Sequence, residues 1–121
     1  MHGYIDTALN TIIENIAVVG RGGNLRLDAV LDTGFNDAFS LPKKHLPDCD
    51  LRYHGTEEYT LANGAVVEEP LYRGKLVIDN RTLEVVMSLT DDDEALLGTR
   101  LLDGKIVTPD FFNYRITENF V

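Results

Sequence analysis

The feature that most constrains this chain is an acidic tripeptide, Asp32-Thr33-Gly34, at the end of an apolar stretch. In residues 25–31, Leu, Leu, Ala and Leu alternate with Arg, Asp and Val, the period of two that a strand with one core face produces. A carboxylate where such a strand turns inward must be paired or hydrogen-bonded, because an unpaired buried charge carries a large desolvation penalty. The Thr33 hydroxyl and the backbone amides that Gly34 allows to come close can supply those bonds. Taken alone, the tripeptide fits either a catalytic site or an ordinary turn with an Asx-type bond.

Two further segments accompany the tripeptide along the chain. Residues 95–102 read Ala-Leu-Leu-Gly-Thr-Arg-Leu-Leu, in which two apolar residues precede a glycine and lead into a short helix. Between the Asp32-Thr33-Gly34 tripeptide and this segment, Asn63-Gly64 separates two apolar runs, which is the strongest local signal for a hairpin. We expect this hairpin to have a two-residue turn with positive φ at both Asn63 and Gly64.

In order and spacing, these segments resemble the retropepsin-like aspartic proteases, in particular their small single-domain bacterial members. Residues 31–36, with Ser-Leu-Pro at 40–42, are similar to the active-site segment of that family. Residues 61–64 are similar to its flap tip, and 96–102 to its apolar-apolar-Gly segment and helix. The resemblance covers residues 12–116. It implies an all-β fold, a closed retropepsin-like acid-protease barrel with one short helix in the C-terminal half.

Composition narrows the class of protein. A chain of 121 residues, 44% of them hydrophobic, is expected to form one globular domain over residues 1–121. A net charge of −9 argues against nucleic acid or an anionic membrane as a partner. No apolar run approaches the length of a membrane span, and residues 1–10 lack the pattern of a signal peptide. A lone Cys49 fits a reducing compartment, so we expect a cytoplasmic protein.

A coarse reading of the chain is mostly β. The glycine-rich stretch at 20–24 could be taken for a phosphate cradle, but no helix signal or Lys-Ser/Thr pair follows it, so a hairpin turn is the better interpretation. The acidic residues 91–94 resemble a helix start, and the helix itself is expected over Leu97 to Leu102. The predicted strands are 11–19, 25–31, 39–41, 57–62, 65–72, 74–78, 83–89, 106–108 and 114–117.

The reaction catalysed by the family that the chain resembles requires two carboxyl groups. Peptide hydrolysis of this kind needs a base to activate water and an acid to protonate the scissile carbonyl, and two carboxyls roughly 3 Å apart share one proton to do both. The chain has a single Asp-Thr-Gly segment. The second carboxylate is therefore expected from another copy of the chain, in a twofold homodimer that acts on a peptide or protein substrate.

The resemblance also implies roles for individual residues. Asp32 is the expected catalytic acid and base, Thr33 is expected to hydrogen-bond across the twofold axis, and Gly34 to bring backbone close to the carboxylate and the substrate. Phe35 is bulkier than the Ala or Ser of retroviral enzymes, which leaves the pocket size open. The predicted substrate-binding residues are Phe35, Asn36 and Asp37 in the cleft, Leu61, Ala62, Asn63 and Gly64 in the flap, and Leu97 reaching the cleft from behind the loop.

No cofactor and no metal site is predicted. One set of possible metal ligands, with the spacing His-x3-Cys-x4-His, fits no compact zinc pattern; it comprises His45, Cys49 and His54 with Asp48 and Asp50. The acidic run at 91–94 lacks the alternation and the glycine of a calcium loop. Ser40 and Ser88 lie in apolar strands without the elbow motif of a serine hydrolase.

Three functions remain open from the sequence. The first is an aspartic endopeptidase that is active as a homodimer through the Asp32 pair. The second is a non-catalytic dimeric binding or assembly module that keeps the acid-protease fold. The third is a structural β-domain in which Asp32 only hydrogen-bonds its own loop.

Overall fold

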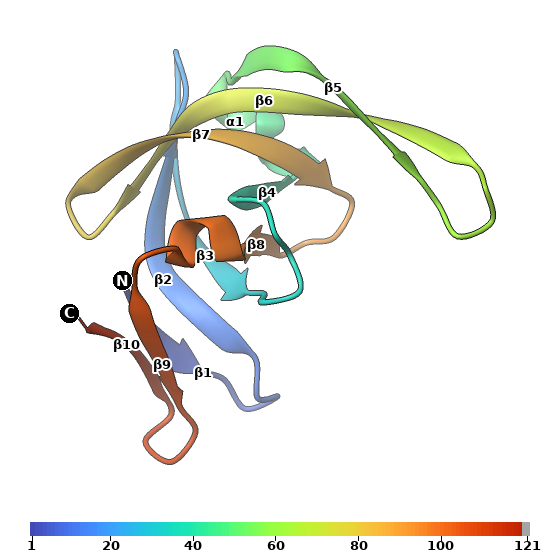
Figure 1. Cartoon of the computed structure of the whole chain (residues 1–121). Helices are drawn as coiled ribbons and strands as arrows, with labels where there is room; N and C mark the ends of the chain where they lie inside the picture. Colours follow the sequence, from blue (N-terminus) through green and yellow to red (C-terminus); the bar gives the residue numbers. More distant parts are fainter. Residues whose placement is uncertain (120–121) are drawn as a thin grey trace.

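The computed structural model describes residues 1–119, whose strands form one sheet that curls and closes on itself (Figure 1). The strand order is β5-β6-β7-β4-β8-β3-β2-β1-β10-β9, and an additional pairing of β2 with β6 closes a six-stranded barrel. The strands are β1 (His2–Ile5), β2 (Thr11–Val19), β3 (Asn24–Leu31), β4 (Phe39–Pro42), β5 (Arg52–Thr60), β6 (Val66–Ile78), β7 (Arg81–Thr90), β8 (Ala95–Leu97), β9 (Ile106–Asp110) and β10 (Arg115–Asn119). The helical segments are η1 (Lys43–His45), α1 (Leu46–Cys49) and η2 (Thr99–Leu102).

The expected all-β barrel with a short helix is confirmed, and most strands lie within two residues of their predicted bounds. Strand β2 matches its prediction at both ends. Strands β1 and β8 were not predicted, and β5 begins at Arg52, five residues before its predicted start. Strand β1 pairs with β2 and β10. The barrel core is filled by side chains with almost no exposed surface, including Ile13, Ile16, Phe39, Leu41, Leu76, Met87 and Ile116.

Strand β6 is longer than the sequence indicates. The predicted break between residues 72 and 74 is absent, and one strand of 13 residues pairs first with β5 and then with β2 and β7. Gly74 serves close packing here, because a Cβ on it would lie 2.5 Å from Leu51 Cδ2 and 3.2 Å from the Val19 carbonyl oxygen. Gly74 therefore does not break the strand but allows it to pack closely against Leu51 and the backbone of β2.

The short C-terminal helix begins later than predicted. Leu97 is the last residue of β8, where it pairs with Leu31 of β3 and Phe39 of β4, and η2 starts at Thr99. The acidic residues 91–94 form bends before β8, so the expectation of a helix start there is wrong. These strand pairings hold residues 95–97 extended, which overrides the local helix signal.

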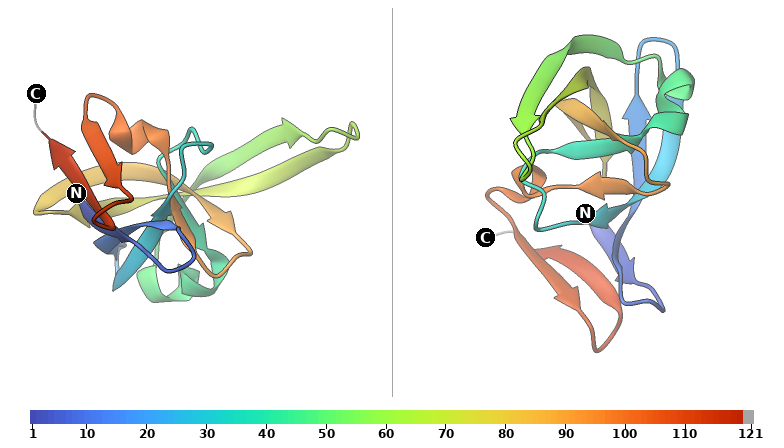
Figure 2. Two further views of the ribbon diagram at one scale, coloured as in Figure 1. Left: turned by 90° about the horizontal axis from the view of Figure 1, so that it is seen from below. Right: turned by 90° about the vertical axis from the view of Figure 1, so that its right-hand side faces the viewer.

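Two arms extend from the barrel. The hairpin of β5 and β6 projects from the body, most clearly in the left view of Figure 2. At the other end of the sheet, the antiparallel strands β1, β10 and β9 bring both ends of the described chain together. Within residues 1–119, no helix has the length and apolar character needed to cross a bilayer.

Candidate active site

The Asp32 loop is positioned by a three-strand arrangement. Strand β8 lies between β3 and β4, parallel to β3 and antiparallel to β4. Residues 32–38 leave β3 and must cross the end of β8 to reach β4. The Asp32 amide donates to the Leu97 carbonyl oxygen at 3.0 Å, which attaches the first residue of the loop to β8.

The Asp32 carboxylate is held by its own loop. The Gly34 amide donates to Asp32 Oδ1 at 2.9 Å, and the Phe35 amide donates to the Asp32 carbonyl oxygen at 3.2 Å. A Cβ on Gly34 would lie 3.2 Å from Asp32 Oδ1, so a side chain at this position would press on the carboxylate. Asp32 is half-buried, and Thr33 and Gly34 are exposed. The carboxylate is therefore oriented by a backbone amide, and Thr33 and Gly34 beside it are exposed to solvent.

The segment after β8 supports the loop from behind. The Gly98 amide donates to the Ala38 carbonyl oxygen at 2.9 Å. Thr99 donates twice to the Phe35 carbonyl oxygen, from its amide at 2.8 Å and from Oγ1 at 3.3 Å. The segment 98–99 therefore supports the loop through backbone hydrogen bonds and through the Thr99 hydroxyl. Sequence reasoning missed Thr99, and a hydroxyl directly after the Leu-Leu-Gly segment was the available signal.

Two of the predicted cleft residues have different surroundings from those expected. Leu97 is fully buried in the barrel core, so the prediction that it reaches the cleft is wrong. Alternation along β8 turns Leu97 inward and leaves its neighbour Leu96 half-buried on the other side. Phe35 is half-buried, with its ring against Gly98, where a Cβ would lie 2.7 Å from Phe35 Cδ2. The Phe35 ring therefore helps to support the loop, in addition to its predicted place in the cleft.

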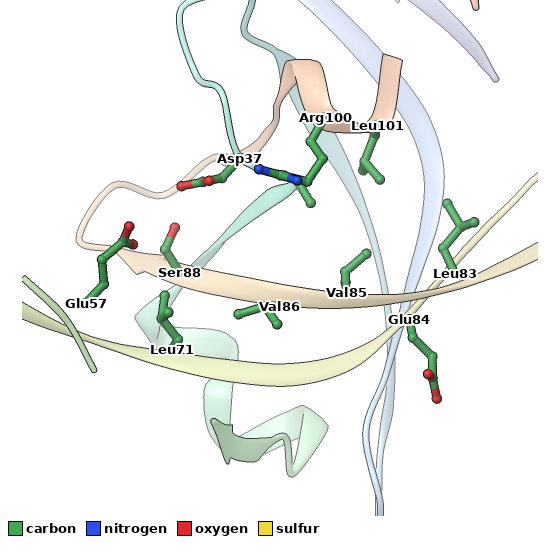
Figure 3. Close-up of a pocket in the computed structure, with 11 residues that line it drawn as sticks. Asp37, Glu57, Leu71, Leu83, Glu84, Val85, Val86, Ser88, Arg100 and Leu101 are labelled. Atoms are coloured by element: carbon green, nitrogen blue, oxygen red, sulfur yellow. The ribbon is translucent and has the colours of Figure 1, made fainter. Parts of the chain in front are cut away.

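A cavity of about 440 Å³ begins at the end of the Asp32 loop. Figure 3 shows Asp37 and Arg100 on one side of it and Leu71, Val85 and Val86 of β6 and β7 on the other. Asn36 faces a separate, shallow depression of about 400 Å³ beside η2. Asp32 lines neither space. The Asp32 carboxylate thus lies outside the hollows that Asp37 and Asn36 border.

The tip of the β5–β6 hairpin has a different turn from the one predicted. Leu61 donates to the Ala65 carbonyl oxygen at 2.8 Å and accepts from the Gly64 amide at 2.9 Å, which encloses a three-residue loop of Ala62, Asn63 and Gly64. Within this loop only Gly64 has positive φ, 86°, so the expectation for Asn63 is wrong. Asn63 instead accepts from the Ala65 amide through Oδ1 at 2.9 Å. This is the pattern of a three-residue hairpin with glycine in the left-handed position.

The two-residue geometry expected at the tip occurs at another hairpin. Asp79 and Asn80 connect β6 to β7 with φ of 50° and 66°, and Ile78 pairs directly with Arg81. Asp79 and Asn80 therefore form the turn with positive φ at both positions that was assigned to Asn63-Gly64. The register of the flanking strands decides which turn forms.

Like charges face one another on the β5–β6 hairpin. Glu57 is the direct cross-strand partner of Glu69, and Glu58 of Glu68. A hydrogen bond to the Glu69 carboxylate raises the pKa of the Tyr59 hydroxyl, followed by a smaller effect of desolvation. Like charges directly opposite destabilise a hairpin. These two like-charge pairs therefore weaken the pairing of the exposed arm at neutral pH.

The described residues offer no group of three metal-binding side chains. Within residues 1–119, no three His, Cys, Asp or Glu side chains cluster closely enough to hold a metal ion. The His45 ring lies 3.7 Å from the Asp48 carboxylate, and Cys49 is fully buried.

Comparison with known proteins gives a structural likeness only. No family model and no curated protein sequence matches the chain. It is similar to the solution structure of the simian foamy virus (mac) protease, with a TM-score of 0.53 and 19% identity over 74% of this chain and 91% of that one. It is also similar to EIAV protease in complex with the inhibitor HBY-793, with a TM-score of 0.50 and 23% identity over 64% of this chain and 74% of that one. The chain therefore has the fold of the retropepsin-like proteases.

Proposed function

We propose that this protein is an aspartic endopeptidase, active as a homodimer in which Asp32 of each subunit forms one carboxyl pair. The observation that carries the proposal is the half-buried Asp32 carboxylate at the end of β3, fixed by the Gly34 amide at 2.9 Å. The likeness to two proteases supports the same general activity. One chain supplies one such loop, so the pair requires a second copy in an isologous interface.

The proposed reaction is direct attack of water on the peptide bond. The ionised carboxylate of the pair accepts a proton from water while the protonated one donates to the carbonyl oxygen of the substrate. The tetrahedral intermediate then collapses, with the proton passing to the leaving amine. Exposure of Thr33 supports its proposed hydrogen bond to the facing loop, which would hold the two carboxylates at the short separation this chemistry needs.

The proposed substrate is an extended peptide segment held between the Asp32 loop and the β5–β6 arm. Exposure of the tip residues 61–64 supports a role as a flap that closes over the peptide and excludes water. Asn36 and Asp37 border the hollows next to the loop and are retained as substrate-binding residues. Phe35 is also proposed to bind substrate, in addition to supporting the loop. Leu97 is not proposed as a substrate-binding residue.

We also propose one domain over residues 1–121 and a cytoplasmic location. The buried free thiol of Cys49 supports a reducing compartment, and burial, together with the charge of Asp48, raises the pKa of that thiol. The net charge of −9 supports a protein substrate over nucleic acid or an anionic membrane.

The test is hydrolysis of a denatured protein by wild type, Asp32→Asn and Asp92→Asn. Asp92 is an exposed carboxylate outside the proposed site, so the control makes the same chemical change elsewhere. We expect cleavage by wild type and Asp92→Asn and none by Asp32→Asn, with sedimentation of the active species as a dimer. Dimers of wild type that bind peptide without cleaving it would instead support the non-catalytic module.

A further inference from the structure

A second cavity gathers the positive charge of an acidic protein. It measures about 300 Å³ and lies where the β2–β3 turn meets β5 and β6. Four of the chain's 11 lysines and arginines line it, Arg21, Arg52, Arg73 and Lys75, together with a single carboxylate, Glu84. The protein as a whole carries a net charge of −9, so this concentration of cations is not a reflection of overall composition.

Strand register places three of these cations on one face of the sheet. Arg52 of β5 is the direct cross-strand partner of Arg73 of β6. Lys75 lies two residues beyond Arg73 and therefore points to the same side, away from the buried Leu76. Directly opposed residues have Cβ atoms about 5 Å apart, and like charges so placed destabilise the pairing. The sheet thus maintains an unfavourable arrangement at this point.

One carboxylate of residues 1–119, Glu84, borders the cavity, where it is the direct cross-strand partner of Lys75, but it lies opposite neither Arg52 nor Arg73. In residues 1–119, the ion pairs within 4.0 Å include Arg21 with Asp50, at 3.4 Å, but none made by Arg52, Arg73 or Lys75. Outside the cavity, four of the seven remaining lysines and arginines are ion-paired, for example Lys43 with Asp91 at 2.9 Å. Twenty acidic residues are available, yet only Glu84 borders the cavity.

We propose that this cavity binds a small phosphate-bearing anion. Two adjacent guanidinium groups present paired donors that match phosphate oxygens, and the Lys75 ammonium adds a third cation on the same face. A phosphoryl group carries close to two negative charges on three oxygens, whereas a single carboxylate brings one charge and two oxygens. The excess of positive charge at the cavity therefore favours phosphate.

In the proposed site, side chains bind the anion, and the backbone amides of the glycine-rich turn do not. The Gly20 amide donates to the Gly23 carbonyl oxygen at 3.0 Å and the Arg21 amide to the Asp50 carbonyl oxygen at 3.1 Å, so both amides are already used. The stretch at 20–23 is the hairpin turn that the sequence indicates, and it contributes Arg21 to the rim. None of the residues 32–38 or 61–64 lines the cavity, so the proposal does not depend on the Asp32 chemistry.

The test is calorimetric titration with inorganic pyrophosphate at about 50 mM salt, where surface charges are weakly screened. Inorganic phosphate and citrate are the comparison ligands, citrate representing a polycarboxylate. We expect saturable binding of pyrophosphate, weakened about tenfold or more by Arg52→Gln and by Arg73→Gln. Arg115→Gln, which removes an exposed arginine on β10, is expected to change the affinity less than about twofold.

Thermal stability gives a second readout that separates binding from a structural role. Without ligand, Arg73→Gln should raise the melting temperature by about 1–3 °C, because it removes the opposed charge. Pyrophosphate should raise the melting temperature of wild type but not of this variant. Absence of saturable binding, equal loss of binding in Arg115→Gln, or citrate binding as tightly as pyrophosphate would each overturn the proposal.

Discussion

Gly98 lies directly beneath the backbone of Asp37, so close that a Cβ on Gly98 would overlap the Asp37 carbonyl oxygen. The same Cβ would lie 2.7 Å from the Phe35 carbonyl oxygen. The loop that begins at Asp32 therefore packs directly on the backbone of Gly98. Its shape depends on this glycine, which lies more than sixty positions later in the chain.

Gly98→Ala should consequently destabilise the protein and displace the Asp32 loop. The methyl group has no space, and overpacking of this kind costs about 1–3 kcal/mol or more. Urea unfolding measures the change. Gly22→Ala is the matched control, because a Cβ there meets its nearest atom, Asp50 Oδ2, at 3.4 Å, and it should alter the free energy of unfolding by less than about 0.5 kcal/mol. Equal stability of the two variants would contradict the proposed support.

Asp32→Asn should abolish peptide hydrolysis and leave the fold intact. The exchange removes the ionisable group but preserves the shape of the side chain and one oxygen to accept from the Gly34 amide. In wild type the rate should follow a bell-shaped pH profile, because the carboxyl pair is active only with one proton shared between its members. Circular dichroism checks the fold, and initial rates across pH check the profile. A sigmoidal profile with a single limb would argue against a carboxyl pair.

Gly64→Val should impair cleavage while the barrel and the dimer persist. Gly64 has φ of 86°, which costs a branched residue about 1–2 kcal/mol, although no atom lies within 4 Å of the added Cβ. The damage is therefore confined to the turn. Gly64→Asn is the control, since asparagine tolerates left-handed backbone, and it should retain most of the activity. The specificity constant, kcat/KM, on one peptide measures both variants, and normal cleavage by Gly64→Val would mean that this hairpin is not the flap.

Asp110→Asn should lower the stability of the β9–β10 hairpin at neutral pH but not in acid. Hydrogen bonds from the side chain and the amide of Asn113, with a further one from the Phe112 amide, hold the pKa of Asp110 below its ordinary value. A depressed folded pKa contributes stability above the ordinary pKa of about 3.8, and that stability is lost as pH falls through the folded value.

The measurement for Asp110 is amide hydrogen exchange in the hairpin, or thermal unfolding, at pH 7 and near pH 2. We expect the variant to be less stable than wild type at pH 7, with the difference shrinking towards zero at the lower pH. Asp92→Asn should show no comparable pH-dependent loss. A difference that persists unchanged in acid would assign the effect to packing instead of ionisation.

The amino-acid sequence by itself determined several strands, among them β2, β3 and β4, and the position of the candidate carboxylate. Alternation of apolar residues is a local property with a period of two, so it set the bounds of β2 and, within a residue, of β3 and β4. The place of Asp32-Thr33-Gly34 at the end of β3 followed from the same pattern. The hydrogen bond from Gly34 to Asp32 spans two residues and is equally local.

Features that depend on which strands become neighbours were decided only by the tertiary structure. The burial of Leu97 and the continuity of β6 through Gly74 arise from partners far away in the chain. The turn at Asn63 depends on the pairing register of β5 and β6, which the dipeptide Asn-Gly does not contain. Arg52 and Arg73 are 21 positions apart in the printed sequence, and only their register places the two charges face to face. Non-local pairing sets these features, because a strand's own residues specify its two faces but not the strand that lies beside it.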